Sequence, residues 1–300
     1  MVGGVYTAVL TPLNKDRSID FGLLTEHCQW LFSNGCNGLA LLGTTGEANS
    51  FSTKERVNYI NKIAASELPL KNIMIGTGCC SVPETALLCK ESVKCGYGGQ
   101  LVLPPFYYKQ VTDEGLYAYF SELIEGLNED RLRIYLYHIP RMTALDMSTH
   151  LLSRLLGTFP ELIIGMKDSS GEWNHTEGIL NSFPNLELFV GSERFLLYTL
   201  RAGGMGCISA TTNLTSKLAG EVYTQFLSGG GMESQQNLTR IREVMEGFPF
   251  IPALKFLLSI TTGNDQWKIL RPPNAPLTPD QEQKLLQRLN AVEFPIHNLS

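Results

Sequence analysis

The stretch that decides the fold is Leu162-Ile163-Ile164-Gly165-Met166-Lys167-Asp168-Ser169-Ser170-Gly171. Its apolar, β-branched first part is typical of a strand buried on both faces, and a polar turn containing glycine follows at once. Lys167 therefore ends a buried strand, where an ammonium group is costly unless it is paired or has lost its proton. A neutral amine there can form a Schiff base with a carbonyl. The alternative is that Lys167 has no chemical role: its methylene stem packs in the barrel while its ammonium group reaches water.

Composition and length exclude several kinds of protein. The 300 residues are 43% hydrophobic and 18% charged, which is enough for a full core, and α/β barrels of about 250 residues fold as one domain. The net charge of −5 gives no electrostatic reason to expect a nucleic-acid partner. No apolar run of membrane-spanning length occurs, and residues 1–10 lack the pattern of a signal peptide, so a cytoplasmic location is expected.

The cysteines do not form a recognisable framework. There are seven, an odd number, and no pair has C-x-x-C spacing. This pattern speaks against both a disulfide framework and a zinc site. Reduced thiols are expected instead.

Seven more apolar runs resemble the strand that ends at Lys167. Their centres recur roughly every 29 residues, with helical patterns and polar turns between them. This alternation predicts a parallel (β/α)₈ TIM barrel of the α/β class, since each crossover between parallel strands needs a helix. The predicted strands, besides the one at 162–167, are residues 5–10, 38–42, 72–75, 100–103, 132–137, 186–190 and 206–210.

The chain continues after the eighth strand. A helix is expected at residues 213–227, and three consecutive glycines at 229–231 then break the pattern. Residues 1–228 are therefore expected to form the barrel that carries the active site, and residues 229–300 a helical extension packed on it. Its expected helices are residues 233–246, 253–260 and 278–292, with prolines between them.

Polar residues gather where the predicted strands end. Strand two runs into Gly43-Thr44-Thr45-Gly46-Glu47, strand five ends at Tyr137 and strand six at Lys167. Since the strand ends of a barrel share one mouth, two hydroxyls, a phenol and an amine should lie together. An amine nucleophile beside a phenol that can pass protons suits carbinolamine chemistry, and a turn rich in N–H and hydroxyl donors suits a carboxylate.

These motifs, together with Tyr137-x-x-Pro140 and Gly165-Met166-Lys167-Asp168, resemble the pyruvate-dependent class I aldolase family. Dihydrodipicolinate synthase and N-acetylneuraminate lyase are well-known members. The resemblance extends over nearly the whole chain, including Gly204-x-Gly206-Cys207-Ile208-Ser209 and Arg271-Pro272-Pro273. It implies a lyase that needs no metal or organic cofactor, and a homo-oligomer that is commonly a tetramer.

The resemblance also implies roles for single residues. Lys167 matches the lysine that binds pyruvate or a 2-oxo acid as an imine, and Tyr137 matches the tyrosine that moves the proton. Thr44 and Thr45 match positions that hold the pyruvate carboxylate or relay protons. Tyr107 matches, in the synthase branch, a tyrosine lent to a neighbouring subunit's site, although packing at a subunit contact is an equal alternative.

Other positions bear on the second substrate. Ile208 would supply a backbone carbonyl near the imine. The synthase branch places an arginine two residues after the proline of its tyrosine motif, but here that position is Met142 and Arg141 precedes it. His138 stands where asparagine is usual, either as a ligand contact or as a buried, hydrogen-bonded histidine. These departures weaken the lysine-biosynthesis interpretation without excluding it.

The segment after strand seven points to a different branch. Gly191-Ser192-Glu193-Arg194 occupies the place where the sialic-acid lyase branch binds sugar hydroxyls. Glu193 would accept hydrogen bonds from a polyol and Arg194 would pair a distal carboxylate. A helix start capped by Ser192, with Glu193 in its first turn, explains the same residues without a ligand.

The expected function is therefore a Schiff-base lyase that cleaves or forms a 2-oxo acid, with pyruvate as one partner. A 2-keto-3-deoxy sugar acid or a related hydroxy-oxo acid is the expected substrate. The alternatives are 4-hydroxy-tetrahydrodipicolinate synthase, which condenses pyruvate with aspartate semialdehyde, and a dehydratase of the same family. A non-catalytic 2-oxo-acid sensor is the alternative from another class.

Overall fold

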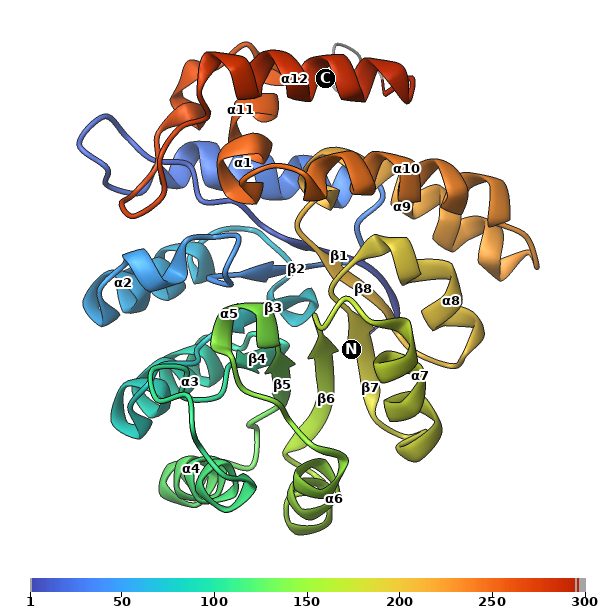
Figure 1. Cartoon of the computed structure of the whole chain (residues 1–300). Coiled ribbons are helices and arrows are strands. Elements are labelled where there is room, and N and C mark those ends of the chain that lie inside the picture. The colour runs from blue at the N-terminus through green and yellow to red at the C-terminus, as the bar shows by residue number, and fades with distance from the viewer. Residues whose placement is uncertain (1, 295, 297–300) are drawn as a thin grey trace.

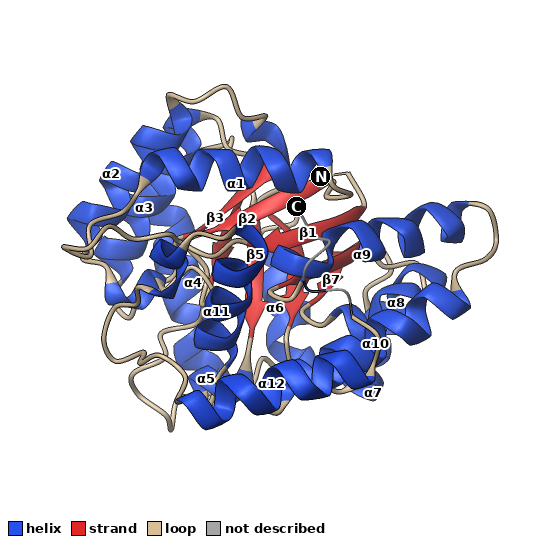
Figure 2. Ribbon diagram, turned by 90° about the horizontal axis from the view of Figure 1, so that it is seen from above, coloured by secondary structure: helices blue, strands red, loops and turns tan. Residues whose placement is uncertain are grey.

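A closed barrel of eight parallel strands, paired in chain order, forms the centre of the molecule (Figures 1 and 2). The computed structural model describes residues 2–294 and 296, so residues 1, 295 and 297–300 of the expected ranges lie outside the described residues. The predicted barrel is confirmed, and each predicted strand lies within two residues of an observed one. The strands are β1 (Gly4–Ala8), β2 (Gly38–Leu41), β3 (Ile73–Gly76), β4 (Gly99–Val102), β5 (Ile134–His138), β6 (Ile163–Asp168), β7 (Glu187–Val190) and β8 (Gly206–Ser209).

Helices surround the barrel and continue after its last strand (Figure 2). Among the described residues, no single helix is both long and apolar enough to cross a membrane, although the consecutive helices Met232–Glu246 and Phe250–Thr262, bent by 114° relative to each other, reach that length and apolarity together. The helices are α1 (Phe21–Ser33), α2 (Thr53–Ala64), α3 (Val82–Cys95), α4 (Asp113–Leu127), α5 (Pro140–Thr143), α6 (Thr149–Thr158), α7 (Trp173–Ser182), α8 (Leu196–Arg201), α9 (Thr212–Leu227), α10 (Met232–Glu246), α11 (Phe250–Thr262) and α12 (Pro279–Ala291).

Two details of the helices differ from the sequence prediction. Ser81-x-x-Glu84 has the sequence of a capping box, but the Ser81 side chain caps no backbone N–H; its hydroxyl donates to the Glu84 carboxylate, which also accepts a bond from Thr53. Helix α11 begins three residues earlier than predicted and includes Pro252, since proline is tolerated in the first turn of a helix. Ser52-x-x-Glu55 has the same pattern, and there the capping box forms at the start of α2.

The barrel interior explains the glycine in the strand that carries Lys167. Tyr135 on β5 is fully buried and packs beside Gly165 on β6, its register partner. A Cβ at Gly165 would lie 2.5 Å from the Tyr135 ring and 2.4 Å from the Glu187 backbone oxygen, so only glycine fits. The Tyr135 ring thus fills the barrel interior one layer below Lys167, because Gly165 and Lys167 are two residues apart on β6 and face the same side.

The helices after β8 pack on the barrel through an apolar cluster and one buried ion pair. The cluster joins Leu10 and Leu214 to side chains of α10, α11 and α12. Lys255 on α11 and Glu47, which follows β2, are both fully buried, and their Nζ and Oε1 atoms lie 2.5 Å apart. Burial lowers the pKa of Lys255, an effect that Glu47 opposes. This ion pair joins the extension to the turn that carries the two threonines.

Candidate active site

The floor of the candidate site is formed by Lys167 and Tyr137. They are register partners on β6 and β5, so both side chains point into the mouth of the barrel. Lys167 is 4% exposed, and its Nζ donates to the Tyr137 Oη over 3.2 Å while lying 4.3 Å from the ring centre. Among the described residues, no carboxylate oxygen lies within 4.0 Å of this Nζ. The partner of the buried Lys167 amine is therefore the Tyr137 phenol, and no carboxylate of the described residues pairs with it.

The turn after β2 brings two hydroxyls to the same place. The Thr44 Oγ1 lies 3.5 Å from the Tyr137 Oη, at the outer limit of a hydrogen bond, and Thr45 is buried beside it. The residues that flank this turn, Leu42 and Glu47, have φ values of 53° and 58°. Left-handed backbone in residues with side chains is costly and persists where the surroundings impose it, often at functional sites.

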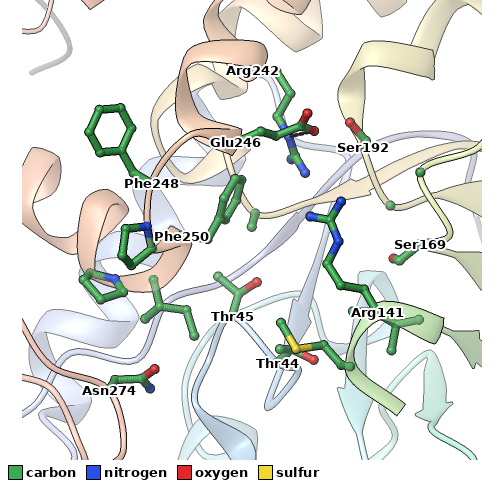
Figure 3. A pocket seen from close by; sticks show the side chains of 18 of the residues that line it. Thr44, Thr45, Arg141, Ser169, Ser192, Arg242, Glu246, Phe248, Phe250 and Asn274 are labelled. Carbon is green, nitrogen blue, oxygen red and sulfur yellow. Dashed lines mark hydrogen bonds and ion pairs between the residues drawn. The ribbon is translucent and has the colours of Figure 1, made fainter. Parts of the chain in front are cut away.

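A cavity of about 620 Å³ opens above the amine, far larger than pyruvate alone requires (Figure 3). One side is formed by the barrel loops, including Ser169, Ser170 and Gly191. The opposite side belongs to the chain after β8, where Phe250 lies beside Arg242 while the Phe248 ring points away from the other labelled side chains (Figure 3). The extension is therefore part of the site and not only a covering layer.

Two guanidinium groups line this cavity in different ways. Arg141 on α5 is exposed at the mouth and makes no hydrogen bond or ion pair within the described part of the chain. Arg242 on α10 is held firmly, since it donates to Glu193, Ser209 and Thr211 through Nη1 and to Glu246 through Nε. Arg141 can therefore bind an anion with all of its N–H groups, whereas Arg242 is held in place and adds a positive charge to the cavity wall.

The structure places several predicted substrate contacts away from the cavity. Glu193 is fully buried and faces Ser209 and Arg242, and Arg194 pairs with Glu246, so neither side chain lines the cavity. The capped helix start, the alternative for this segment, does not form either, because Ser192 caps no backbone N–H. The Ser192 hydroxyl is buried without a described partner and lines the cavity.

Four further predicted positions have mixed outcomes. Gly191 lines the cavity, as expected of a strand-end residue. Ile208 is buried in the barrel interior beside Tyr137, and its side chain does not reach the cavity. Tyr107 is 72% exposed and lies outside its own chain's cavity, stacked edge-on against Tyr108. Arg141 and Met142 both reach the mouth, so the one-residue shift does not turn the arginine away.

Behind Tyr137 and Lys167, the next residues of both strands form a buried polar network. The Asp168 carboxylate accepts hydrogen bonds from His138, His175, Thr176 and Ser170. Burial disfavours its charged form, but the bonds from the histidines and Thr176 outweigh burial and hold the pKa of Asp168 below its usual range. Of the two alternatives for His138, the buried and hydrogen-bonded one is what the structure shows.

Sequence reasoning missed the contribution of the extension to the site. Arg242, Glu246, Phe248, Phe250 and Asn274 all line the cavity, yet none belongs to a strand-end motif. One signal was available in Arg242, which follows Leu238 and Ile241 on an amphipathic helix but stands at the edge of its apolar face.

A (β/α)₈ barrel with an amine, a phenol and hydroxyls at the carboxyl ends of its strands defines a barrel enzyme of the aldolase class. Comparison with known proteins narrows the class. The model of the dihydrodipicolinate synthetase family matches residues 1–292. The chain belongs to that family, whose members are pyruvate-dependent lyases and aldolases, and it is an enzyme of this kind.

Individual relatives cover nearly the whole chain. A protein of Chloroflexus aurantiacus named as an uncharacterized DapA-like lyase is 34% identical over 280 residues, 93% of each chain. A 4-hydroxy-tetrahydrodipicolinate synthase of Agrobacterium fabrum is 29% identical over 289 residues, 94% of this chain and 95% of its own. The crystal structure of dihydrodipicolinate synthase from Agrobacterium tumefaciens superposes with a TM-score of 0.87 at 31% identity, covering 96% of this chain and 99% of that one.

Proposed function

We propose that the protein is a Schiff-base lyase that interconverts a hydroxylated 2-oxo acid with pyruvate and an aldehyde. The observation that carries the proposal is the buried Lys167 Nζ, which lies 3.2 Å from the Tyr137 Oη at the floor of the cavity. A lysine in this position can serve as nucleophile, and a phenol at that distance can exchange protons with it. Family membership supports the same chemistry.

The cleavage reaction then follows in balanced steps. The Lys167 Nζ adds to the C2 keto carbon, and the resulting carbinolamine loses its oxygen as water to leave an imine. Tyr137 gives its proton to the oxygen that leaves as water, which lets it then take the C4 hydroxyl proton; the C3–C4 bond breaks, and its electron pair moves into the protonated imine to give an enamine. The aldehyde departs, C3 is protonated, and water releases pyruvate from Lys167. Thr44, whose Oγ1 lies 3.5 Å from the Tyr137 Oη, would pass protons to and from Tyr137.

The substrate class follows from what lines the cavity. A 2-keto-3-deoxy sugar acid, or a related hydroxy-oxo acid, would have its C1 carboxylate near the Thr44–Thr45 turn and its polar tail toward Ser169, Ser170 and Ser192. The unpaired Arg141 suits a second carboxylate or another anionic end. Condensation of pyruvate with aspartate semialdehyde is the second candidate, favoured by the relatives of that name and by the same arginine.

The first test is to trap the imine. Borohydride added in the presence of pyruvate should reduce the adduct, and peptide mass spectrometry should find it on Lys167. The peptide containing Lys109, which lies in the loop after β4 outside the cavity, should remain unmodified. If folded protein gives no adduct, the imine mechanism is wrong and a reversible 2-oxo-acid sensor would need to be considered.

Screening then separates the candidate substrates. Turnover of aspartate semialdehyde with pyruvate would identify a dihydrodipicolinate synthase, and cleavage of sugar acids to pyruvate would identify an aldolase. Loss of water without cleavage of a carbon–carbon bond would identify a dehydratase. These products are distinguishable by mass, so a single assay format serves all three.

Arg141 is expected to bind the second substrate and not pyruvate. In Arg141→Ala, the KM of an anionic second substrate should rise roughly 10- to 100-fold, the cost of one charge-assisted contact. The yield of the pyruvyl adduct should not change. Arg201→Ala, which removes an exposed guanidinium at the end of α8, is the matched control and should behave as wild type. Equal KM values in the two variants would show that Arg141 does not bind substrate.

We also propose that the chain assembles as a homo-oligomer, a tetramer by family resemblance, in which Tyr107 reaches a neighbouring subunit. Its ring is 72% exposed and is adjacent to Tyr108, which is 73% exposed. Two exposed aromatic rings side by side are typical of a contact surface. Tyr107 would then complete a neighbour's site through Thr44, while its own cavity receives the same residue from another copy.

A further inference from the structure

A cluster of two histidines and two aspartates lies behind the imine-forming pair. His138 and Asp168 directly follow Tyr137 and Lys167 on their strands, so their side chains point to the opposite face, away from the cavity. The His138 Nδ1 lies 3.0 Å from Asp168 Oδ1, and the Nδ1 of His175 on α7 lies 3.2 Å from Asp168 Oδ2. The centroids of the two imidazole rings are 4.6 Å apart, and their planes are tilted by 31° to each other.

One carboxylate therefore orients both rings. An ionised carboxylate only accepts hydrogen bonds, and Asp168 also accepts from Ser170 and Thr176. Each ring must carry its proton on Nδ1 to make these bonds, which leaves the Nε2 lone pair free in the neutral ring. A histidine that donates its other N–H to a carboxylate is the usual arrangement of metal-binding imidazoles, and here it occurs twice on a shared carboxylate.

Asp146 supplies a third potential ligand to the same place. Its Oδ1 lies 3.1 Å from the His138 Nε2, and one ligand atom from each of His138, His175 and Asp146 lies within 4.8 Å of the others. The Asp146 Oδ1 also accepts a hydrogen bond from the Met147 N–H over 2.9 Å, which fixes its direction, and the side chain is 75% exposed, which leaves an open side for ion entry and a water ligand. Two imidazoles, a carboxylate and a water form a common donor set for zinc.

We propose that His138, His175 and Asp146 bind a divalent transition-metal ion of the zinc type, with Asp168 orienting both histidines. The ligands come from the end of β5, from α7 and from the segment that follows α5. Two nitrogen donors and one oxygen donor favour zinc over magnesium, which prefers oxygen ligands only. The competing occupant is a proton on the His138 Nε2, which would simply hydrogen-bond to Asp146.

The position of the ion suggests what it does. Asp146 follows α5, the short helix that carries Arg141 to the mouth of the cavity. A metal that fixes Asp146 to His138 and His175 would therefore fix the end of this segment against the barrel. This consequence depends on the proposed function: the ion should lower the KM of an anionic second substrate and leave formation of the pyruvyl imine unchanged.

The test is metal binding by the full chain after treatment with a chelator, without any substrate. Calorimetric titration should show one Zn²⁺ per chain, and Mg²⁺ should not compete. Asp146→Asn should weaken Zn²⁺ binding about tenfold, and His175→Ala, which removes a ligand completely, at least 100-fold. Changes around a metal typically cost about 10- to 100-fold in affinity. His150→Ala, which removes an exposed histidine of α6 outside the cluster, should bind as wild type.

Two outcomes would overturn the proposal. One is absence of a stoichiometric site in wild type, which would leave the proton as the occupant. The other is Zn²⁺ binding that survives in both cluster variants but disappears in Cys80→Ser, which would place the ion on the exposed thiol. Far-ultraviolet circular dichroism checks that the variants fold, and trapping of the pyruvyl adduct in the metal-free protein tests the lyase mechanism separately.

Discussion

Replacing Lys167 with alanine is expected to lower turnover by about 10⁴-fold or more, since the loss of a covalent nucleophile acts on that scale. The amine lies at the floor of the cavity with the Tyr137 hydroxyl 3.2 Å away, and no other lysine of the described residues lines the cavity to take its place. Without Nζ no imine forms, so the electron pair of the breaking bond has nowhere to go. Turnover and the borohydride-trapped adduct should disappear together.

A phenylalanine at position 137 provides the matching contrast. Tyr137→Phe keeps the ring that packs under the Lys167 Nζ but removes the proton carrier, so turnover should fall about 10²- to 10⁴-fold. Its pyruvyl adduct should still appear after longer incubation. Lys62→Ala, on the exposed face of α2, controls for the loss of a lysine. Turnover of Lys167→Ala at the level of this control would rule out the Schiff-base mechanism.

The barrel and the pairing of Lys167 with Tyr137 at its mouth were predictable from sequence because both depend on short-range patterns. Buried strands appear as apolar runs, and the residue that ends each run must lie at the mouth of a parallel barrel. Lys167, Tyr137 and Thr44 were therefore identified together. The helix α5 was not predicted, since its four residues are too few to show the periodic pattern that marks a helix.

What the sequence did not reveal depends on contacts between distant segments. Glu193 was expected at the cavity, but its neighbours in space include Ser209 and Arg242, which lie 16 and 49 residues away. Nothing in the local pattern distinguishes a carboxylate that contacts substrate from one that holds an arginine. The argument against a zinc site considered cysteines only, and so it did not address His138, Asp146 and His175, which meet only in the fold.

The second large effect is expected at the ion pair between Lys255 and Glu47. Both side chains are fully buried, so Lys255→Met leaves a carboxylate whose described partners are only the Arg271 N–H and the Asn274 amide. Removing one partner of a buried pair costs about 3–5 kcal/mol of unfolding free energy. The same Lys→Met change at Lys284, whose pair with Asp280 on α12 is exposed, should cost less than about 0.5 kcal/mol. Urea unfolding of both variants measures the difference.

The double variant Glu47→Gln/Lys255→Met decides whether the cost comes from the unpaired charge. A neutral pair of similar volume leaves no buried charge, so it should recover all but about 1–2 kcal/mol of the lost stability. The pair also has a second consequence, because Glu47 ends the turn that carries Thr44 and holds Asn274 in the cavity wall. The single variant should therefore lose kcat/KM for the second substrate even at low temperature, where it is folded. If the double variant is no more stable than Lys255→Met, packing of the lysine stem and not its charge joins the extension to the barrel.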